Sequence, residues 1–156
     1  MSDYQEFIRT KRITHQHSGI TVVDGQINQK LYQFQRDIVR WACGKGRAAI
    51  FADTGLGKTF QQLEWARLMG ENTLIIAPLS VARQTVREAS KIGVEVRYVR
   101  NAAQMTPEHR IWITNYEMIE KFDASAFGAV VLDESSILKA LDGKTRRMLT
   151  EMFAQT

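Results

Sequence analysis

Short apolar runs alternate along this chain with segments whose apolar residues recur at helical spacing. Five such runs, rich in small or β-branched residues, predict strands at residues 48–51, 73–77, 94–99, 111–114 and 129–132. Each run is followed by a helical or turn segment. Strands that are apolar throughout, rather than at alternate positions, are typical of a sheet covered on both faces. The pattern therefore predicts an α/β fold, mainly a parallel sheet with helices on both faces.

Two helices are predicted around the first of these runs. The apolar positions of the first helix are Leu31, Phe34, Ile38 and Trp41, and a glycine at position 44 closes it. The apolar positions of the second are Phe60, Leu63, Leu68 and Met69. Residues 1–30 mix charged and polar residues with turn signals, which indicates a lead-in segment before a domain spanning 31–156.

Composition narrows the class of protein. The chain has 156 residues, 44% hydrophobic and 24% charged, which suits one globular domain. Its net charge of +4 suits a polyanionic partner without requiring one. The single Cys43 excludes an internal disulfide, and the longest apolar stretch falls short of the about 20 residues that span a bilayer. These features predict a soluble cytoplasmic protein.

Residues 52–59, Ala-Asp-Thr-Gly-Leu-Gly-Lys-Thr, predict a phosphate-binding loop between a strand and a helix. The glycines let backbone N–H groups turn toward phosphate oxygens, and the N-terminus of the next helix adds partial positive charge. The candidate nucleotide-binding residues of the loop are Thr54, Gly55, Leu56, Gly57, Lys58 and Thr59. Lys58 is expected to reach the terminal phosphates and the Thr59 hydroxyl to hold Mg²⁺. The alternative is a flexible glycine-rich turn.

An acidic pair, Asp133 and Glu134, follows the last predicted strand directly. Two carboxylates at the end of a buried strand are costly unless a cation lies near them. Because ligands of parallel sheets bind at the carboxyl ends of the strands, this pair and the glycine loop can face one nucleotide. Asp133 would hold the Mg²⁺ shell, and Glu134 would take a proton from the attacking water. The alternative is a pair that caps the following helix.

From about residue 31 onward, these segments resemble the first RecA-like domain of superfamily 2 helicases and translocases, closest to the Swi/Snf-like branch of phage and chromatin-remodelling ATPases. Residues 53–59 look like the Gly-Leu-Gly-Lys-Thr loop of that branch. Residues 31–35 are similar to its adenine-reading Q motif, in which Gln35 would contact the adenine, with Gln33 as a rival in register. Lys139 matches a lysine common in the branch. The resemblance implies ATP and Mg²⁺ as cofactors.

Two further segments resemble nucleic-acid motifs of the same family. Residues 77–81 look like the first, and residues 113–118 look like the next. The residues that would contact the nucleic acid are Pro78, Ser80, Arg83, Gln84, Asn115 and Tyr116. Arg83, Arg87 and Lys91 also share a helix face by i, i+4 spacing. That face would either track phosphates or be solvated. The resemblance implies DNA, in duplex form, as the partner.

The chain also departs from the family. Ser135 and Ser136 follow the acidic pair where most relatives have alanine or glycine and then histidine, which puts the coupling of hydrolysis to nucleic acid in doubt. The sequence stops before the third family motif and the second RecA-like domain, which supplies an arginine worth about 10³- to 10⁵-fold in rate. We therefore expect an ATP-binding half of a DNA motor that hydrolyses ATP poorly alone. The host cytoplasm is the expected location if the chain is phage-encoded.

The absent third motif has an expected structural consequence. In the family its strand lies between the phosphate-loop strand and the acidic strand. We expect the two strands to close on each other, another segment to fill the gap, or the fragment to be marginally stable. Two other functions stay open: a non-catalytic nucleotide-binding or regulatory module, as a split subunit or natural short product, and a small-molecule P-loop kinase.

Overall fold

The computed structural model describes residues 19–133 and 143–153 of the chain. Its four described strands form one sheet in the order β2-β3-β1-β4, and every pairing is parallel. The strands are β1 (Thr73–Ala77), β2 (Arg97–Tyr98), β3 (Ile111–Asn115) and β4 (Ala129–Leu132). The α-helices are α2 (Gln33–Lys45), α3 (Lys58–Met69), α4 (Leu79–Lys91) and α5 (Gly143–Met152). Short 3-10 helices are η1 (Asp24–Gln26), η2 (Ala102–Gln104), η3 (Tyr116–Lys121) and η4 (Ala124–Ala126).

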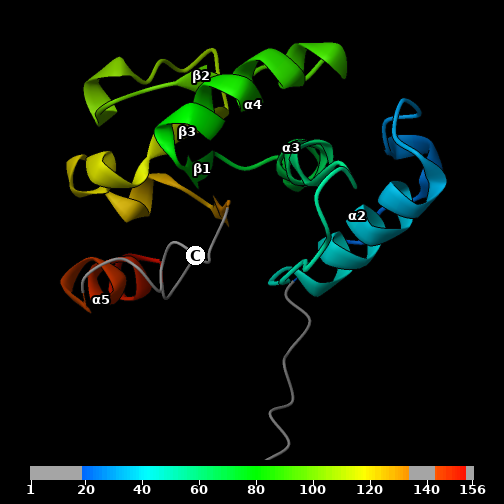
Figure 1. Ribbon diagram of the computed structural model, residues 1–156, viewed down its shortest axis with the longest axis horizontal. Helices are drawn as coiled ribbons and strands as arrows, with labels where there is room; N and C mark the ends of the chain where they lie inside the picture. Colours follow the sequence, from blue (N-terminus) through cyan, green and yellow to red (C-terminus); the bar gives the residue numbers. More distant parts are fainter. Residues whose placement is uncertain (1–18, 134–142, 154–156) are drawn as a thin grey trace, which may run out of the picture.

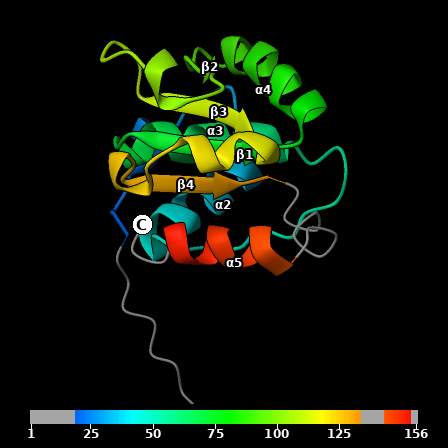
Figure 2. The same ribbon diagram turned by 90° about the vertical axis from the view of Figure 1, so that its left-hand side faces the viewer.

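Helices cover both faces of the sheet, as predicted (Figures 1 and 2). Successive residues of β1 point to opposite faces, and all are buried. Ile75 and Ala77 belong to a core cluster that includes residues of α3 and α4. Leu74 and Ile76 belong to a second cluster that includes residues of η3 and α5. The two-sided burial explains why β1 is apolar at every position, and it confirms the α/β fold with a parallel sheet.

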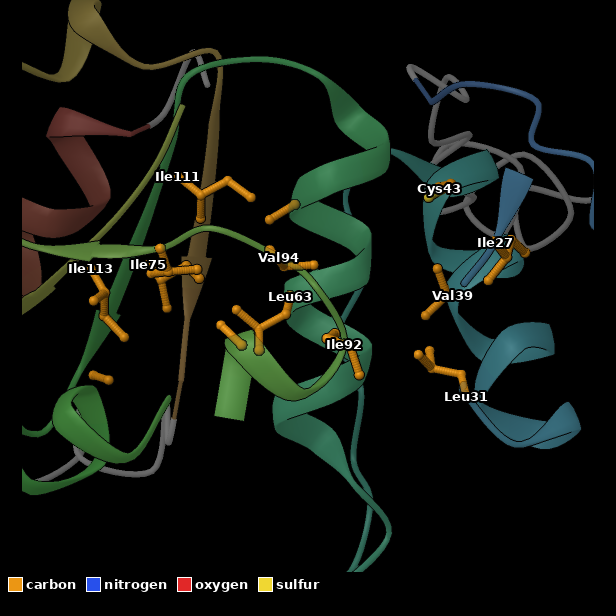
Figure 3. Close-up of a cluster of buried hydrophobic side chains, with 14 of the residues drawn as sticks. Ile27, Leu31, Val39, Cys43, Leu63, Ile75, Ile92, Val94, Ile111 and Ile113 are labelled. Atoms are coloured by element: carbon orange, nitrogen blue, oxygen red, sulfur yellow. The ribbon is translucent and has the colours of Figure 1, made fainter. Parts of the chain in front are cut away.

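The first cluster extends from the sheet through α3 to α2 (Figure 3). Leu63 of α3 lies at its centre, while Val39 of α2 packs with Ile27 and Leu31 of the preceding segment. Figure 1 shows α2 on the far side of α3 from the sheet, and α2 packs closely along α3. Residues before 31 thus contribute to the same core, while the domain boundary placed at residue 30 stays a prediction.

Within the described ranges, no helix is long and apolar enough to cross a bilayer.

The predicted helix over α2 is confirmed, but its buried face is not the stripe of large apolar residues. The fully buried positions of α2 are Gln35, Val39, Ala42 and Cys43. Phe34 and Trp41 are 44% and 48% exposed. The smaller side chains face α3 because they allow the two helices to lie close together. The buried Gln35 is the polar exception, and its contacts define the site described below.

Two predicted strands differ in the structure. Residues 94–99 contain only the two-residue strand β2. Residues 48–51 form no strand, and Phe51 is 94% exposed. A strand exists only through pairing, and β4 is the edge of the described sheet, with β1 as its one neighbour there. Of the three outcomes expected for the missing strand, the closing of residues 48–51 onto β4 does not occur in the described sheet, and the other two stay predictions.

Candidate nucleotide-binding site

The glycine loop has the backbone geometry of an anion-binding turn. Gly55 and Gly57 have φ angles of 84° and 72°, in the left-handed region that favours glycine. Helix α3 begins at Lys58, directly after Gly57. The first N–H groups of a helix have no acceptor within it, and they carry partial positive charge. The loop and α3 therefore form a backbone suited to phosphate oxygens, although the strand predicted before the loop is absent, and the role of residues 52–59 stays a prediction.

The Lys58 side chain folds back over the loop that precedes it. Its Nζ atom lies 2.6 Å from the carbonyl oxygen of Ala52 and 3.2 Å from that of Asp53. The ammonium group is thus held on the loop side of α3, next to the backbone that would receive the phosphates. This position fits the predicted contact of Lys58 with a terminal phosphate.

Gln35 is the residue of α2 that reaches the loop. It is 4% exposed, its Oε1 accepts the N–H of Tyr32 at 2.9 Å, and its Nε2 donates to the carbonyl of Leu56 at 3.1 Å. Gln33, the rival in register, instead bonds Asp37 on the exposed side of α2. The geometry favours Gln35 of the two glutamines. Contact with an adenine requires exchange of one of its present hydrogen bonds, and the adenine role stays a prediction.

A second glutamine supports the same loop carbonyl. Gln61 of α3 is 1% exposed and donates from Nε2 to the carbonyl of Leu56 at 3.0 Å. Its Oε1 is buried and has no hydrogen-bond partner in the described part of the chain. The sequence reasoning missed Gln61, although its position one turn beyond Gly57 is a usable signal. Two buried amides therefore fix the loop at Leu56.

Replacing Gly57 by alanine should disturb the site more than the same change at Gly55. A Cβ at position 57 would lie 2.4 Å from Nε2 of Gln35, whereas nothing lies within 4 Å of one at position 55. Both changes carry the left-handed penalty of about 1–2 kcal/mol. Gly57→Ala should also lose the Gln35 hydrogen bond to Leu56, which adds about 1 kcal/mol. Urea unfolding of the two variants measures the difference, and equal losses of stability would contradict this arrangement.

Asp133 is fixed at the end of β4 by contacts to three different elements. Its N–H donates to the carbonyl of Ile76 at 2.9 Å, which continues the ladder with β1. Its carbonyl accepts the hydroxyl of Tyr116 at 2.7 Å. Its Oδ2 accepts Nε2 of Gln62 at 3.2 Å, and Gln62 lies one turn beyond Lys58 on α3. The structure thus brings Asp133 to the phosphate-loop helix. Glu134, Ser135, Ser136 and Lys139 lie outside the described residues.

The donor set at this place fits magnesium. Thr59 offers a hydroxyl from the first turn of α3, and Asp133 offers a carboxylate; both residues are half-buried. Mg²⁺ prefers oxygen ligands and is usually held by one or two carboxylates together with substrate phosphates and water. Across the described ranges, no group of three or more His, Cys, Asp or Glu side chains could hold a metal. Phosphate oxygens would therefore have to complete the shell.

The predicted nucleic-acid residues fall into two groups. Ser80, Arg83 and Gln84 are exposed on the first turns of α4, and Pro78 precedes that helix at the end of β1. Arg83 makes no ion pair within the described ranges, so its guanidinium is available to a partner. Gln84 donates to Glu88 at 2.8 Å on the same face. This surface suits contact with a phosphate backbone.

Asn115 and Tyr116 form the second group, and both are buried. Asn115 is 4% exposed; its Oδ1 accepts the hydroxyl of Tyr98 at 2.6 Å, and its Nδ2 donates to Glu117. Tyr116 is 5% exposed and bonds the backbone of Asp133. The structure gives their side chains internal partners and no support for the direct contact expected of them. Asn115 lies on the same face of β3 as Ile111 and Ile113 of the first core cluster, whereas Tyr116 belongs to the second cluster.

An ion pair between the buried Glu64 and the partly exposed Arg67 lies on α3, and it was not predicted from the sequence. Glu64 is 0% exposed and accepts hydrogen bonds from Nε of Arg67 at 2.9 Å and from a second guanidinium nitrogen of Arg67 at 2.7 Å.

Burial, reinforced by the Glu64 charge, raises the pKa of the Cys43 thiol to about 11. Cys43 thus stays a protonated core residue.

Comparison with known proteins identifies the relatives of the chain. No protein-family model matches it. A Drosophila melanogaster "SWI/SNF-related matrix-associated actin-dependent regulator of chromatin subfamily A-like protein 1" is 27% identical over 154 residues, covering 89% of this chain and 20% of the relative. The Xenopus tropicalis protein of the same name is 30% identical over 145 residues, covering 85% and 15%. The chain thus spans a fifth or less of each curated relative.

A solved structure shows the same fold. The SWI2/SNF2 ATPase core of Sulfolobus solfataricus, in complex with dsDNA, has a TM-score of 0.68, 21% sequence identity, and coverage of 85% of this chain and 32% of that chain. These three relatives come from a fly, a frog and an archaeon, so they give no support to the phage-type placement. Over most of its length, the chain is therefore similar in sequence to SWI/SNF-related proteins, and it has the RecA-like fold of a SWI2/SNF2 ATPase core.

Proposed function

We propose that this chain is the ATP-binding half of an ATP-dependent DNA helicase or translocase motor. The main observation behind the proposal is that one helix links the two parts of the site. Helix α3 begins at the end of the loop at residues 52–59, and Gln62 of the same helix donates a hydrogen bond to the Asp133 carboxylate. A phosphate loop alone is common to many nucleotide-binding proteins. A phosphate loop with a carboxylate held one turn along its helix supports a site for a triphosphate with its metal.

Each site residue has a role in this proposal. The backbone of the loop and the Lys58 ammonium would bind the β- and γ-phosphates, while Gln35 would contact the adenine. The Thr59 hydroxyl and the Asp133 carboxylate would hold Mg²⁺, which neutralises charge on the phosphates when bound. Glu134 would accept a proton from the attacking water.

Duplex DNA is the partner we propose, for three reasons. The archaeal structure of the same fold is a complex with dsDNA. The exposed start of α4 carries Ser80, Arg83 and Gln84, groups that suit contacts to phosphate oxygens. The net charge of +4 acts in the same direction.

A second RecA-like domain, in cis or in trans, completes the motor in this proposal. Phosphoryl transfer depends on cations around the developing charge, and one arginine from a second domain contributes about 10³- to 10⁵-fold. The chain covers 32% of the archaeal ATPase core, so most of that core lies outside the matched part. We therefore expect the isolated chain to bind Mg-ATP and to hydrolyse it poorly.

Calorimetry with Mg-ATP and a phosphate-release assay with duplex DNA test the proposal together. We expect binding with turnover near background, and we expect Glu134→Gln to bind as the wild type does. Adding the second domain in trans should raise turnover in the wild type but not in Glu134→Gln. Absence of Mg-ATP binding would refute the proposal, as would fast turnover by the pure chain. Binding without any gain from the second domain would instead support a regulatory nucleotide-binding module.

A further inference from the structure

Two residues outside the predicted site hold Asp133 in place. Asp133 sits where β4 ends, so the ladder with β1 fixes its N–H but neither its carbonyl nor its side chain. Gln62 contacts the carboxylate, and Tyr116 contacts the carbonyl. Both contacts come from elements that are far from β4 in sequence and adjacent to it in space.

Gln62 links the carboxylate to the helix that carries the phosphate-loop lysine. Its Nε2 donates to Oδ2 of Asp133 at 3.2 Å. Because Gln62 lies one turn after Lys58 on the same rigid helix, this hydrogen bond sets the distance from the carboxylate to the loop. An amide N–H on Oδ2 also orients the carboxyl plane, which leaves Oδ1 for a cation.

Tyr116 fixes the backbone from the opposite face of the sheet. Its ring is 5% exposed and belongs to the second core cluster, and its hydroxyl lies 2.7 Å from the carbonyl oxygen of Asp133. A buried ring has little rotational freedom, so its hydroxyl is a fixed donor. Tyr116 also follows Asn115, the last residue of β3, so it connects the end of that strand to the end of β4.

We infer that Gln62 and Tyr116 are positioning residues, which hold Asp133 at the place where it coordinates magnesium on a bound nucleotide. This inference rests on the proposed function, because Asp133 has a coordinating role only if the site binds Mg²⁺. Hydrogen-bonded partners of metal ligands commonly change metal affinity by about 10- to 100-fold when they are replaced. Neither residue touches the nucleotide in this assignment, so their effect should depend entirely on magnesium.

The test is the magnesium dependence of nucleotide affinity. A fluorescent ATP analogue is titrated into each variant in saturating Mg²⁺ and in EDTA, and the ratio of the two dissociation constants is compared. Tyr116→Phe removes one hydroxyl and keeps the ring, while Gln62→Met keeps the length and removes the N–H donor. Tyr98→Phe and Gln104→Ala are matched controls, because they remove a tyrosine hydroxyl and a surface amide that do not contact Asp133. Asp133→Ala marks full loss of the magnesium effect.

We expect each positioning variant to reduce the magnesium ratio about tenfold, with affinity in EDTA unchanged, and each control to keep the wild-type ratio. If Tyr116→Phe or Gln62→Met lowers affinity equally in Mg²⁺ and EDTA, the residue supports the fold only, and the inference is overturned. A wild-type ratio in both variants overturns it as well. A wild type without any magnesium effect would refute the proposed function itself. Thermal unfolding without nucleotide shows that the variants are folded, and the half-buried Gln62 gives an independent answer if Tyr116→Phe is unstable.

Discussion

Replacing Lys58 by alanine should weaken ATP binding about 100-fold, which corresponds to about 2.7 kcal/mol. Lys58 is the lysine that lies on the loop, and hydrogen bonds to charged groups contribute about 1.5–3 kcal/mol each. The fold should survive, because among the described residues the Lys58 ammonium contacts only the backbone carbonyls of Ala52 and Asp53. Alanine is also a good helix former for the first position of α3.

Calorimetric titration with Mg-ATP measures this loss, and far-UV circular dichroism checks the fold. Lys121→Ala is the matched control. Lys121 is exposed at the end of η3, and its replacement removes the same positive charge away from the loop. The control should bind ATP as the wild type does. An unchanged affinity in Lys58→Ala would remove the basis for the nucleotide site.

Replacing Glu64 by alanine should lower the free energy of unfolding by about 1.5–3 kcal/mol, because it removes a buried carboxylate that accepts charge-assisted hydrogen bonds, while the Arg67 guanidinium is 40% exposed to water. The Glu64 carboxylate is fully buried and accepts hydrogen bonds from two nitrogens of Arg67 and, at 2.7 Å, from the N–H of Asn28. The hydrogen bonds that Arg67 donates to Glu64 raise the pKa of Arg67 above its ordinary value, so Arg67 is charged at neutral pH. Loss of the Glu64 carboxylate would leave the Asn28 N–H and part of a guanidinium unsatisfied.

The network also holds the segment before α2 onto α3. Arg67 donates to the carbonyl of Gln26 at 2.6 Å, and Asn28 donates from Nδ2 to the carbonyl of Ile92 at 2.6 Å. Urea unfolding of Glu64→Ala measures the effect, with the exposed Glu95→Ala as the control. The double variant Glu64→Leu/Arg67→Met should be more stable than the single variant Glu64→Leu, because both charges of the pair are then removed. A loss under about 1 kcal/mol in Glu64→Ala would contradict the importance of this network.

Features of the fold set by local pattern were predictable from the sequence. The bounds of β1 and β4 were predicted correctly, because continuous apolar runs between turn signals require burial on both faces. The glycine loop and the start of α3 were also predictable, because left-handed glycines and a helix N-terminus have a local sequence signature. The proximity of Asp133 to the helix that follows the glycine loop was predictable, because ligands of parallel sheets bind at the carboxyl ends of the strands and these ends meet at one edge.

Features that depend on tertiary partners were not predictable. Residues 48–51 have the apolar pattern of a strand, but pattern does not supply the neighbouring strand that pairing requires. The contacts of Gln62 and Tyr116 with Asp133 join residues 71 and 17 positions apart, and no local signal reports such distances. The burial of Glu64 was missed because a charged residue on a helix is ordinarily solvated, and only the placement of Asn28 and Arg67 makes its burial tolerable.

The most direct measurement is a crystal structure of the chain with an unhydrolysable ATP analogue and Mg²⁺. We predict that the triphosphate lies along the loop at residues 52–59, with Lys58 on its terminal phosphates and the metal between Thr59 and Asp133. Analogue bound elsewhere on the molecule, with Lys58 and Asp133 free of ligand, would contradict it.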